Sequence, residues 1–270
     1  MESVNEAGFE RIRISGWRLG FDNLFSKEMR EWLAARRWLL QVILWVSLLN
    51  GFLVAVLFLL PNIMAATGEA AIENPIADGV IGFFGLGGMA LSIGIIILNQ
   101  NEIIGEKQSG TAEWVLSKPA SRSAFFLSKL SANLLGMLLA MILPPSLVAL
   151  GLVKFVEPGA VSLNSFLAGT GMLALNVFFY LCLTLLLGVL ADSREMALGV
   201  SLGTLLFGLI ARNFIGPVVL ITPWLLSDLA GVVAMGEPVG LEIWLPILST
   251  AGWSLLFIGV ALWRFKRFEF

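Results

Sequence analysis

Residues 102–122 read EIIGEKQSGTAEWVLSKPASR, a polar stretch between two apolar segments. A helix that crosses the hydrocarbon core of a membrane needs roughly 20 apolar residues, and each flanking segment meets that length. The charges of this stretch, together with Gly110 and Pro119, interrupt the apolar pattern. The two flanking segments are therefore predicted to be separate membrane spans joined at one face of the membrane.

The composition of the whole chain agrees with a membrane protein. Of the 270 residues, 58% are hydrophobic and 13% are charged, whereas soluble domains carry about 25% charged residues. The formal net charge of −2 gives no reason to expect a nucleic-acid partner. The single cysteine, Cys182, excludes an intrachain disulfide, and the absence of histidine removes the commonest metal ligand and general base.

Apolar runs of sufficient length predict an all-α polytopic membrane protein with six transmembrane helices. Pro144 and Pro145 lack backbone donors and predict a kink in the third span. The predicted spans are residues 38–60, 79–98, 126–153, 165–190, 196–221 and 242–263.

The predicted spans divide the chain into three parts. Residues 1–37 form an N-terminal segment, residues 38–263 form the transmembrane domain, and residues 264–270 form a tail. Within the domain, 101–128 is a polar loop. Residues 214–241 are apolar but contain Pro217, Pro223 and Pro238, so their helical pattern is predicted to be too broken to cross the membrane.

The distribution of positive charge predicts the orientation. Fifteen of the 17 lysines and arginines fall in segments on one side, leaving Lys154 and Arg212 for the other. By the positive-inside rule, both termini and residues 102–122 are cytoplasmic, in a multi-pass protein of the plasma or inner membrane. Lys129 lies in the first turns of the third predicted span, and its ammonium group is expected to reach the lipid headgroups. Arg212 lies close to the outer headgroups, so it is expected either to reach them in the same way or to have a functional role as an ion within the membrane.

Residues 23–38, NLFSKEMREWLAARRW, predict an amphipathic helix in the membrane interface. Apolar side chains recur there at steps of three and four. One interpretation is an anchor that orients the first span, and the other is a helix that joins a cytoplasmic partner to it. The positions on the predicted apolar face are Phe25, Met29, Trp32 and the stem of Arg36.

A short helix is also predicted inside the polar loop. Thr111 can cap its start, and Glu113 would then lie in the first turn, where the helix dipole favours a negative charge. Pro119 ends it. Trp114 and Leu116 would be available to fill a groove on a cytoplasmic partner. The alternative is that Trp114 lies in the headgroup layer as an aromatic-belt residue.

Gly199 and Gly203 in the fifth predicted span have the GxxxG spacing that lets helices approach closely. They predict either a contact between subunits or ordinary packing inside one subunit.

Residues 102–130 resemble the signature loop of ABC-2 type transporter permeases, and residues 27–38 resemble the segment that precedes the first span in that family. Six spans in a chain of this length are also usual there. The loop residues that match the family pattern in order are Glu102, Glu106, Lys107, Gly110, Thr111, Leu116, Ser117, Pro119, Ser121, Arg122 and Lys129.

The resemblance implies a mechanism and a set of partners. In that family the loop contains a coupling helix that docks on an ATPase subunit, and the amphipathic segment is a connecting helix. Residues 214–241 resemble the family's outer re-entrant helices, which close the extracellular side. The family implies two ATPase subunits and a second permease, either an identical copy or a paralogue, with a path near the first, second and fifth spans. The predicted ATPase-coupling residues are Glu102, Glu106, Lys107, Gly110, Thr111, Glu113, Trp114, Leu116, Pro119 and Arg122.

No GxxxxGK[ST] phosphate-binding loop occurs in the sequence. We therefore expect no catalytic residue, cofactor or metal site on this chain, with ATP and Mg bound by the partner ATPase. The predicted function is the permease of an ATP-driven exporter. A membrane anchor or mechanotransmission scaffold remains an alternative, and an intramembrane enzyme is disfavoured because paired carboxylates and a nucleophile with a neighbouring base are missing. Few polar residues in the spans favour an amphipathic or lipidic cargo.

Overall fold

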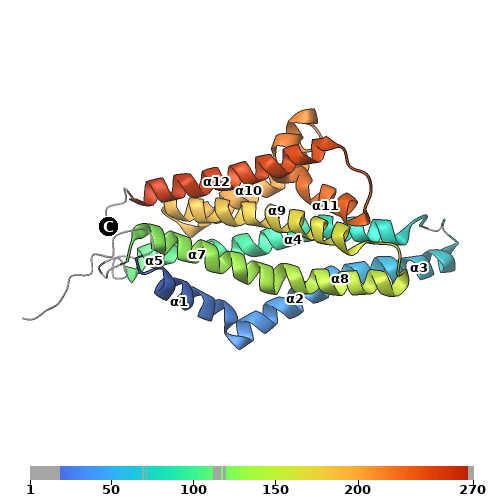
Figure 1. Ribbon diagram of the computed structural model, residues 1–270, viewed down its shortest axis with the longest axis horizontal. Coiled ribbons are helices and arrows are strands. Elements are labelled where there is room, and N and C mark those ends of the chain that lie inside the picture. Colours follow the sequence, from blue (N-terminus) through green and yellow to red (C-terminus); the bar gives the residue numbers. More distant parts are fainter. Residues whose placement is uncertain (1–18, 69, 71, 112–116, 118–119, 267–270) are drawn as a thin grey trace, which may run out of the picture.

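The computed structural model describes residues 19–68, 70, 72–111, 117 and 120–266, and these form a bundle of helices without a strand (Figure 1). Six helical stretches are long and apolar enough to cross a membrane, which confirms the predicted all-α fold with six spans. The stretches are Arg36–Thr67, Pro75–Gln108, Arg122–Val156, Leu163–Leu190, Arg194–Ala211 and Leu241–Phe265.

Several spans are composed of more than one helical element. The first three contain α2 (Ala35–Val54), η1 (Ala55–Leu59), α3 (Leu60–Thr67), α4 (Pro75–Asn99), α5 (Ile104–Gln108), α7 (Arg122–Gly136), η2 (Met137–Ile142) and α8 (Leu143–Val156). The remainder are α1 (Phe21–Leu33) ahead of the first span, then α9 (Leu163–Leu190), α10 (Arg194–Ala211), η3 (Gly216–Ile221), η4 (Pro223–Leu225), α11 (Leu226–Met235), η5 (Leu241–Ile243) and α12 (Trp244–Lys266).

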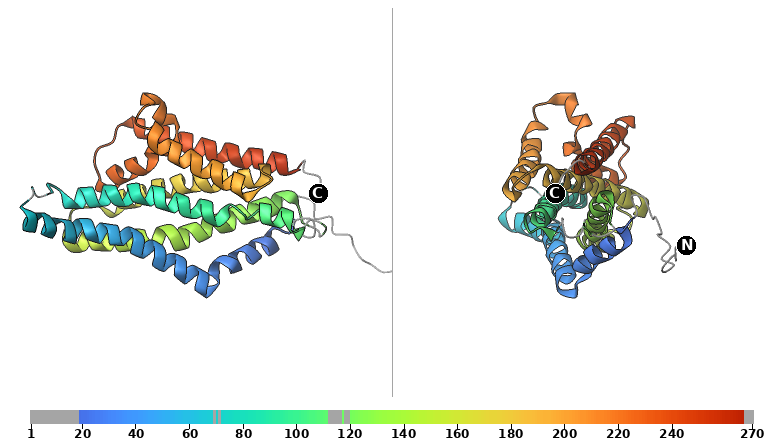
Figure 2. Two further views of the ribbon diagram at one scale, coloured as in Figure 1. Left: turned by 180° about the vertical axis from the view of Figure 1, so that it is seen from behind. Right: turned by 90° about the vertical axis from the view of Figure 1, so that its left-hand side faces the viewer.

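Helix α9 forms the centre of the bundle. It packs against α4, α11 and α12, and its apolar residues surround the helix, which is the pattern of a helix buried on all sides. The end-on view of Figure 2 places α1 and α2 on the opposite side of the bundle from α10 and α12. Those outer helices leave large apolar side chains exposed, among them Leu44, Phe207 and Leu255, as expected where lipid is the solvent.

The third span continues through Pro144 and Pro145. A π-helical segment, Met137–Ile142, precedes the prolines, which then fall in the first turn of α8. The wider turn and the first-turn position accommodate the missing proline N–H groups. The prolines therefore alter the hydrogen bonding of the span without ending it.

The fifth span is shorter than predicted. It ends at Ala211, whereas the sequence predicted a helix to residue 221. Gly216 adopts a left-handed backbone with φ 54°, and the 3-10 segment that begins there contains Pro217 at its start. Glycine tolerates that conformation and proline cannot continue an α-helix, so the chain turns after Ala211.

The structure also bears on two other expectations for the fifth span, which concern Arg212 and the glycine pair. Arg212 does not simply reach outward, because its guanidinium pairs with Asp228 at the start of α11. Around Gly199 and Gly203, a Cβ atom would meet nothing within 4 Å among the described residues. Among the described residues the two glycines therefore have no close packing partner, and a contact between subunits stays a prediction.

Candidate functional site

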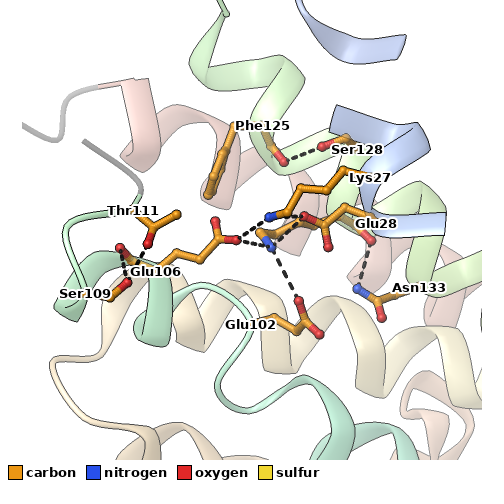
Figure 3. A network of polar contacts seen from close by, with 10 residues as sticks. Lys27, Glu28, Glu102, Glu106, Ser109, Thr111, Phe125, Ser128 and Asn133 are labelled. Atoms are coloured by element: carbon orange, nitrogen blue, oxygen red, sulfur yellow. Dashed lines mark hydrogen bonds and ion pairs between the residues drawn. The ribbon is translucent and has the colours of Figure 1, made fainter. Parts of the chain in front are cut away.

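The candidate site is a cluster of charged side chains, which we call the Lys129 network. It consists of Lys27, Glu28, Glu102, Glu106 and Lys129 (Figure 3). Helices α1, α5 and α7 contribute to it, and Glu102 comes from the turn after α4. These elements meet at one end of the bundle, where α5 ends and α7 begins (Figure 1).

The buried cation at the centre is Lys129. Its Nζ atom lies 3.0 Å from Glu28 Oε1, 3.2 Å from Glu106 Oε1 and 3.4 Å from Glu102 Oε2, and its side chain is 2% exposed. The expectation that this ammonium group reaches the lipid headgroups is therefore wrong. The reason is tertiary: α1 folds back along α7 and places the buried carboxylate of Glu28 beside the lysine.

A second cation, Lys27, borders the same carboxylates. Its Nζ atom lies 3.1 Å from Glu106 Oε1 and 3.5 Å from Glu28 Oε1. Burial lowers the pKa of Lys27, but the neighbouring Glu106 and Glu28 carboxylates outweigh that effect, so its pKa lies above the ordinary value. Three carboxylates thus share two ammonium groups, and removing either cation would leave negative charge without compensation in a poorly hydrated site.

Next to the network, a tryptophan attaches α1 to α7. The Trp32 indole Nε1 donates to Asn133 Oδ1 at 2.9 Å, and Asn133 Nδ2 donates to the Lys129 backbone carbonyl, also at 2.9 Å. Gly136 provides the space for the ring, because a Cβ there would lie 2.1 Å from Trp32 Cδ2. The indole is therefore enclosed by protein and satisfied as a donor.

Only part of the predicted apolar face of the amphipathic helix is buried against the rest of the protein. Trp32 is buried, Phe25 and Met29 are half-buried, and Arg36 is exposed in α2. Leu33 is 55% exposed. Helix α1 is a separate helix that packs on α7, while its position in a membrane interface stays a prediction.

The short helix α5 is attached to the central helix α9 as well. Lys107 Nζ donates to the backbone carbonyls of Val189 at 3.3 Å and Ala191 at 3.2 Å. These acceptors lie at the C-terminus of α9, where carbonyls lack partners within the helix and where the helix dipole favours a positive charge. Ile103 packs against Gly188, so the apolar contact supports the polar one.

The structure brings together only part of the predicted site. Glu102 and Glu106 enter the network, Lys107 caps α9, and Arg122 begins α7. Gly110 has a left-handed backbone, with φ 72°, and the Thr111 hydroxyl lies 2.8 Å from Ser109 Oγ. The predicted short helix, with Glu113, Trp114, Leu116 and Pro119, falls outside the described residues.

The sequence interpretation did not identify Lys27, Glu28 and Asn133 as site residues. One signal was available: Lys129 lies within the first turn of the third predicted span, and a charged side chain within a span usually has a partner of opposite charge. Glu28 was a candidate for this partner, because it is an acidic residue in the same amphipathic helix as Trp32. The pairing spans 101 positions, so local spacing alone could not select it.

The contacts of the site join several helices to one another. No cluster of three or more potential metal-ligating residues occurs among the described residues. The Lys129 network joins α1, the α4–α5 turn and α7, and Lys107 extends this connection to α9. A displacement of one of these elements must therefore move the others or break buried ion pairs.

A comparison with protein-family models identifies the family to which the chain belongs. The family described as ABC-2 family transporter protein matches residues 23–227, from α1 into α11. No curated protein matches the chain. The match includes every residue of the Lys129 network and the first five spans. The chain therefore belongs to the ABC-2 family of transporter proteins and is the membrane component of an ABC transporter.

Proposed function

We propose that this chain is the permease subunit of an ABC exporter, in which the Lys129 network transmits the motion of a separate ATPase to the spans. The network carries this proposal, because it connects both ends of the loop at 109–121 to the rest of the bundle. The loop begins directly after α5, and its far end leads into α7, whose Lys129 pairs with Glu106 of α5 at 3.2 Å.

A push on the loop would be distributed through these contacts. The Ser121 backbone N–H donates to the Leu19 carbonyl at 2.9 Å, so the segment before α1 is attached to the same end of the loop. Lys107 joins α5 to the central helix α9. Helices α1, α5, α7 and α9 would then shift together, which is the rigid-body type of transition.

The remaining parts of the proposal concern the partners. ATP and Mg would bind two ATPase subunits, and this chain would hydrolyse no ATP by itself. A second permease would contact the open face of α10 around Gly199 and Gly203, where no described residue fills the space. Both termini and the loop would face the cytoplasm of a cell bounded by the plasma or inner membrane, as the distribution of positive charge indicates.

The test replaces Lys107 by methionine, which keeps the length of the side chain and removes the charge that caps α9. The full chain is purified with and without its ABC ATPase, and ATPase binding and ATP hydrolysis are measured. We expect Lys107→Met to retain binding within about twofold and to lose at least about tenfold of the hydrolysis that the permease stimulates, because transmission to α9 is lost.

Lys154→Met is the matched control, because Lys154 is exposed in the last turn of α8 and is not part of the Lys129 network. Full stimulation by Lys107→Met would contradict the transmission route. Hydrolysis of ATP by the isolated chain would contradict the assignment of catalysis to the partner.

A further inference from the structure

A cavity of about 240 Å³ lies in the half of the bundle away from the Lys129 network. Helices α4, α9 and α10 enclose it together with the outer segment Pro223–Met235. It is separate from the contacts that join α1, α5 and α7, and nothing in the proposed transmission route uses it. Figure 1 shows α11 in the half of the bundle that lies away from α5.

One side of the cavity carries two opposite charges. The Arg212 guanidinium donates to the Asp228 carboxylate, and their side chains are 30% and 40% exposed. Burial raises the pKa of Asp228, although Arg212 opposes this effect. The carboxylate is therefore not fully compensated by the guanidinium, and an additional cation would stabilise its charged form.

Two further polar groups lie in the wall. The Trp224 indole N–H is buried, and it pairs with the Tyr180 hydroxyl. The indole is held there by close packing, since a Cβ on Gly208 would lie 2.2 Å from Trp224 Cδ1. The Tyr180 hydroxyl accepts from the indole and can still donate its own hydrogen to an oxygen atom of a ligand in the cavity.

The rest of the wall contains both apolar and polar side chains. Leu86, Met89, Leu205 and Leu209 provide a hydrocarbon surface, and the polar side chains beside it are Asn176, Tyr180 and Ser227. Pockets of this composition favour molecules with a polar end and an apolar end.

The ion pair is not required to hold α11 in place. Ser227 packs directly against Gly88, because a Cβ added to Gly88 would lie 2.2 Å from the Ser227 Cβ. Gly231 packs in the same way against Ile81. The side chains of Leu226 and Ala230 are fully buried. Apolar packing therefore attaches α11 to its neighbours, and the partly exposed charges remain accessible from the cavity.

We propose that this cavity binds an amphipathic molecule with a zwitterionic head group. Its anionic group would pair with Arg212, its cationic group with Asp228, and its apolar end would lie along Leu205 and Leu209. A ligand with a single charge would separate the two side chains and satisfy only one of them, whereas a zwitterion satisfies both. A neutral ligand would gain nothing from either charge.

The test measures binding to the purified full chain without any ATPase, so its outcome does not depend on the proposed coupling. Native mass spectrometry counts the bound molecules for three probes that share two six-carbon chains: dihexanoyl-phosphatidylcholine, dihexanoyl-phosphatidylglycerol and dihexanoylglycerol. We expect the zwitterionic probe to bind at least about tenfold more tightly than the anionic and the neutral ones. Equal binding of all three would overturn the proposal.

Variants then locate the binding. Arg212→Gln and Asp228→Asn should each weaken binding of the zwitterionic probe at least about tenfold, because each leaves one end of the ligand without a partner. Leu209→Trp retains the ion pair and fills the apolar part, and it should weaken binding to a similar degree. Arg194→Gln is the control, since it removes an exposed ion pair with Glu195. Unchanged binding by Leu209→Trp and by the folded charge variants would overturn the proposal.

Phosphocholine, which has the same head group but no acyl chains, tests whether the apolar end of the ligand contributes to binding. Binding of phosphocholine with affinity near that of the dihexanoyl lipid would overturn the proposed amphipathic ligand, because the apolar wall would then contribute nothing to the affinity. A loss of at least about tenfold would support a membrane lipid, because the apolar wall then contributes to the affinity.

Discussion

Lys129 illustrates how a single residue can join distant parts of this chain. A lysine with an almost fully buried side chain is unfavourable unless carboxylates surround it, and here three do. The attraction offsets the loss of hydration only while all partners stay in place. The residue therefore resists any motion that separates α1 from α7.

Replacing Lys129 by methionine should destabilise the protein by about 3–5 kcal/mol, since it leaves buried carboxylates with too little positive charge. Thermal unfolding of the purified chain in detergent measures the effect. Adding Glu28→Gln to Lys129→Met should recover part of the stability, because it removes one of the uncompensated charges. Lys154→Met, at an exposed position, should leave unfolding unchanged. A Lys129→Met protein as stable as this control would show that the buried pairs contribute nothing.

Among the elements, the contact of α1 with α7 depends on one glycine. The Trp32 ring lies where a side chain on Gly136 would otherwise be, and its indole N–H bonds to Asn133. This contact holds α1 on the same helix that carries Lys129. Together, the apolar and the charged contacts make α1 a part of the bundle and not a free surface helix.

Gly136→Ala should displace Trp32 and cost about 1–3 kcal/mol, the usual range for overpacking. Gly151→Ala is the matched control in the same span, because a Cβ there meets nothing within 4 Å. The control should be neutral or slightly stabilising, since alanine is the better helix former. Thermal unfolding and the tryptophan emission spectrum of both variants provide the measurement. Equal stability of the two variants would mean that α1 does not dock as described.

At the scale of the whole molecule, the loops at the two ends of the bundle should lie on opposite sides of the membrane. Ser109 and Gly159 are exposed at these ends, and the buried Cys182 can be replaced by alanine to remove the native thiol. In that background, Gly159→Cys should react with an impermeant maleimide added to intact cells. Ser109→Cys should react only after the membrane is opened, because the positive-inside rule places that loop in the cytoplasm. Labelling of both positions in intact cells would contradict the orientation.

The number of spans and the polar loop between the second and third spans followed from the sequence alone. Hydropathy over some 20 residues is a local property, and no tertiary contact is needed to recognise it. The residues in the loop also carried the resemblance to ABC-2 permeases, which the family comparison confirmed. Local signals failed at the end of the fifth span, where Gly216 and Pro217 turn an otherwise apolar run.

Only the tertiary structure decided which charges meet. Glu28 pairs with Lys129 across 101 positions, and Arg212 pairs with Asp228 after the turn that follows α10. In both cases the sequence indicated a cation near a span end, for which the lipid headgroups are the default partner. Helix packing placed a carboxylate beside each cation instead. A protein carboxylate can replace the headgroups only after packing has brought it into contact, and no local pattern specifies that contact.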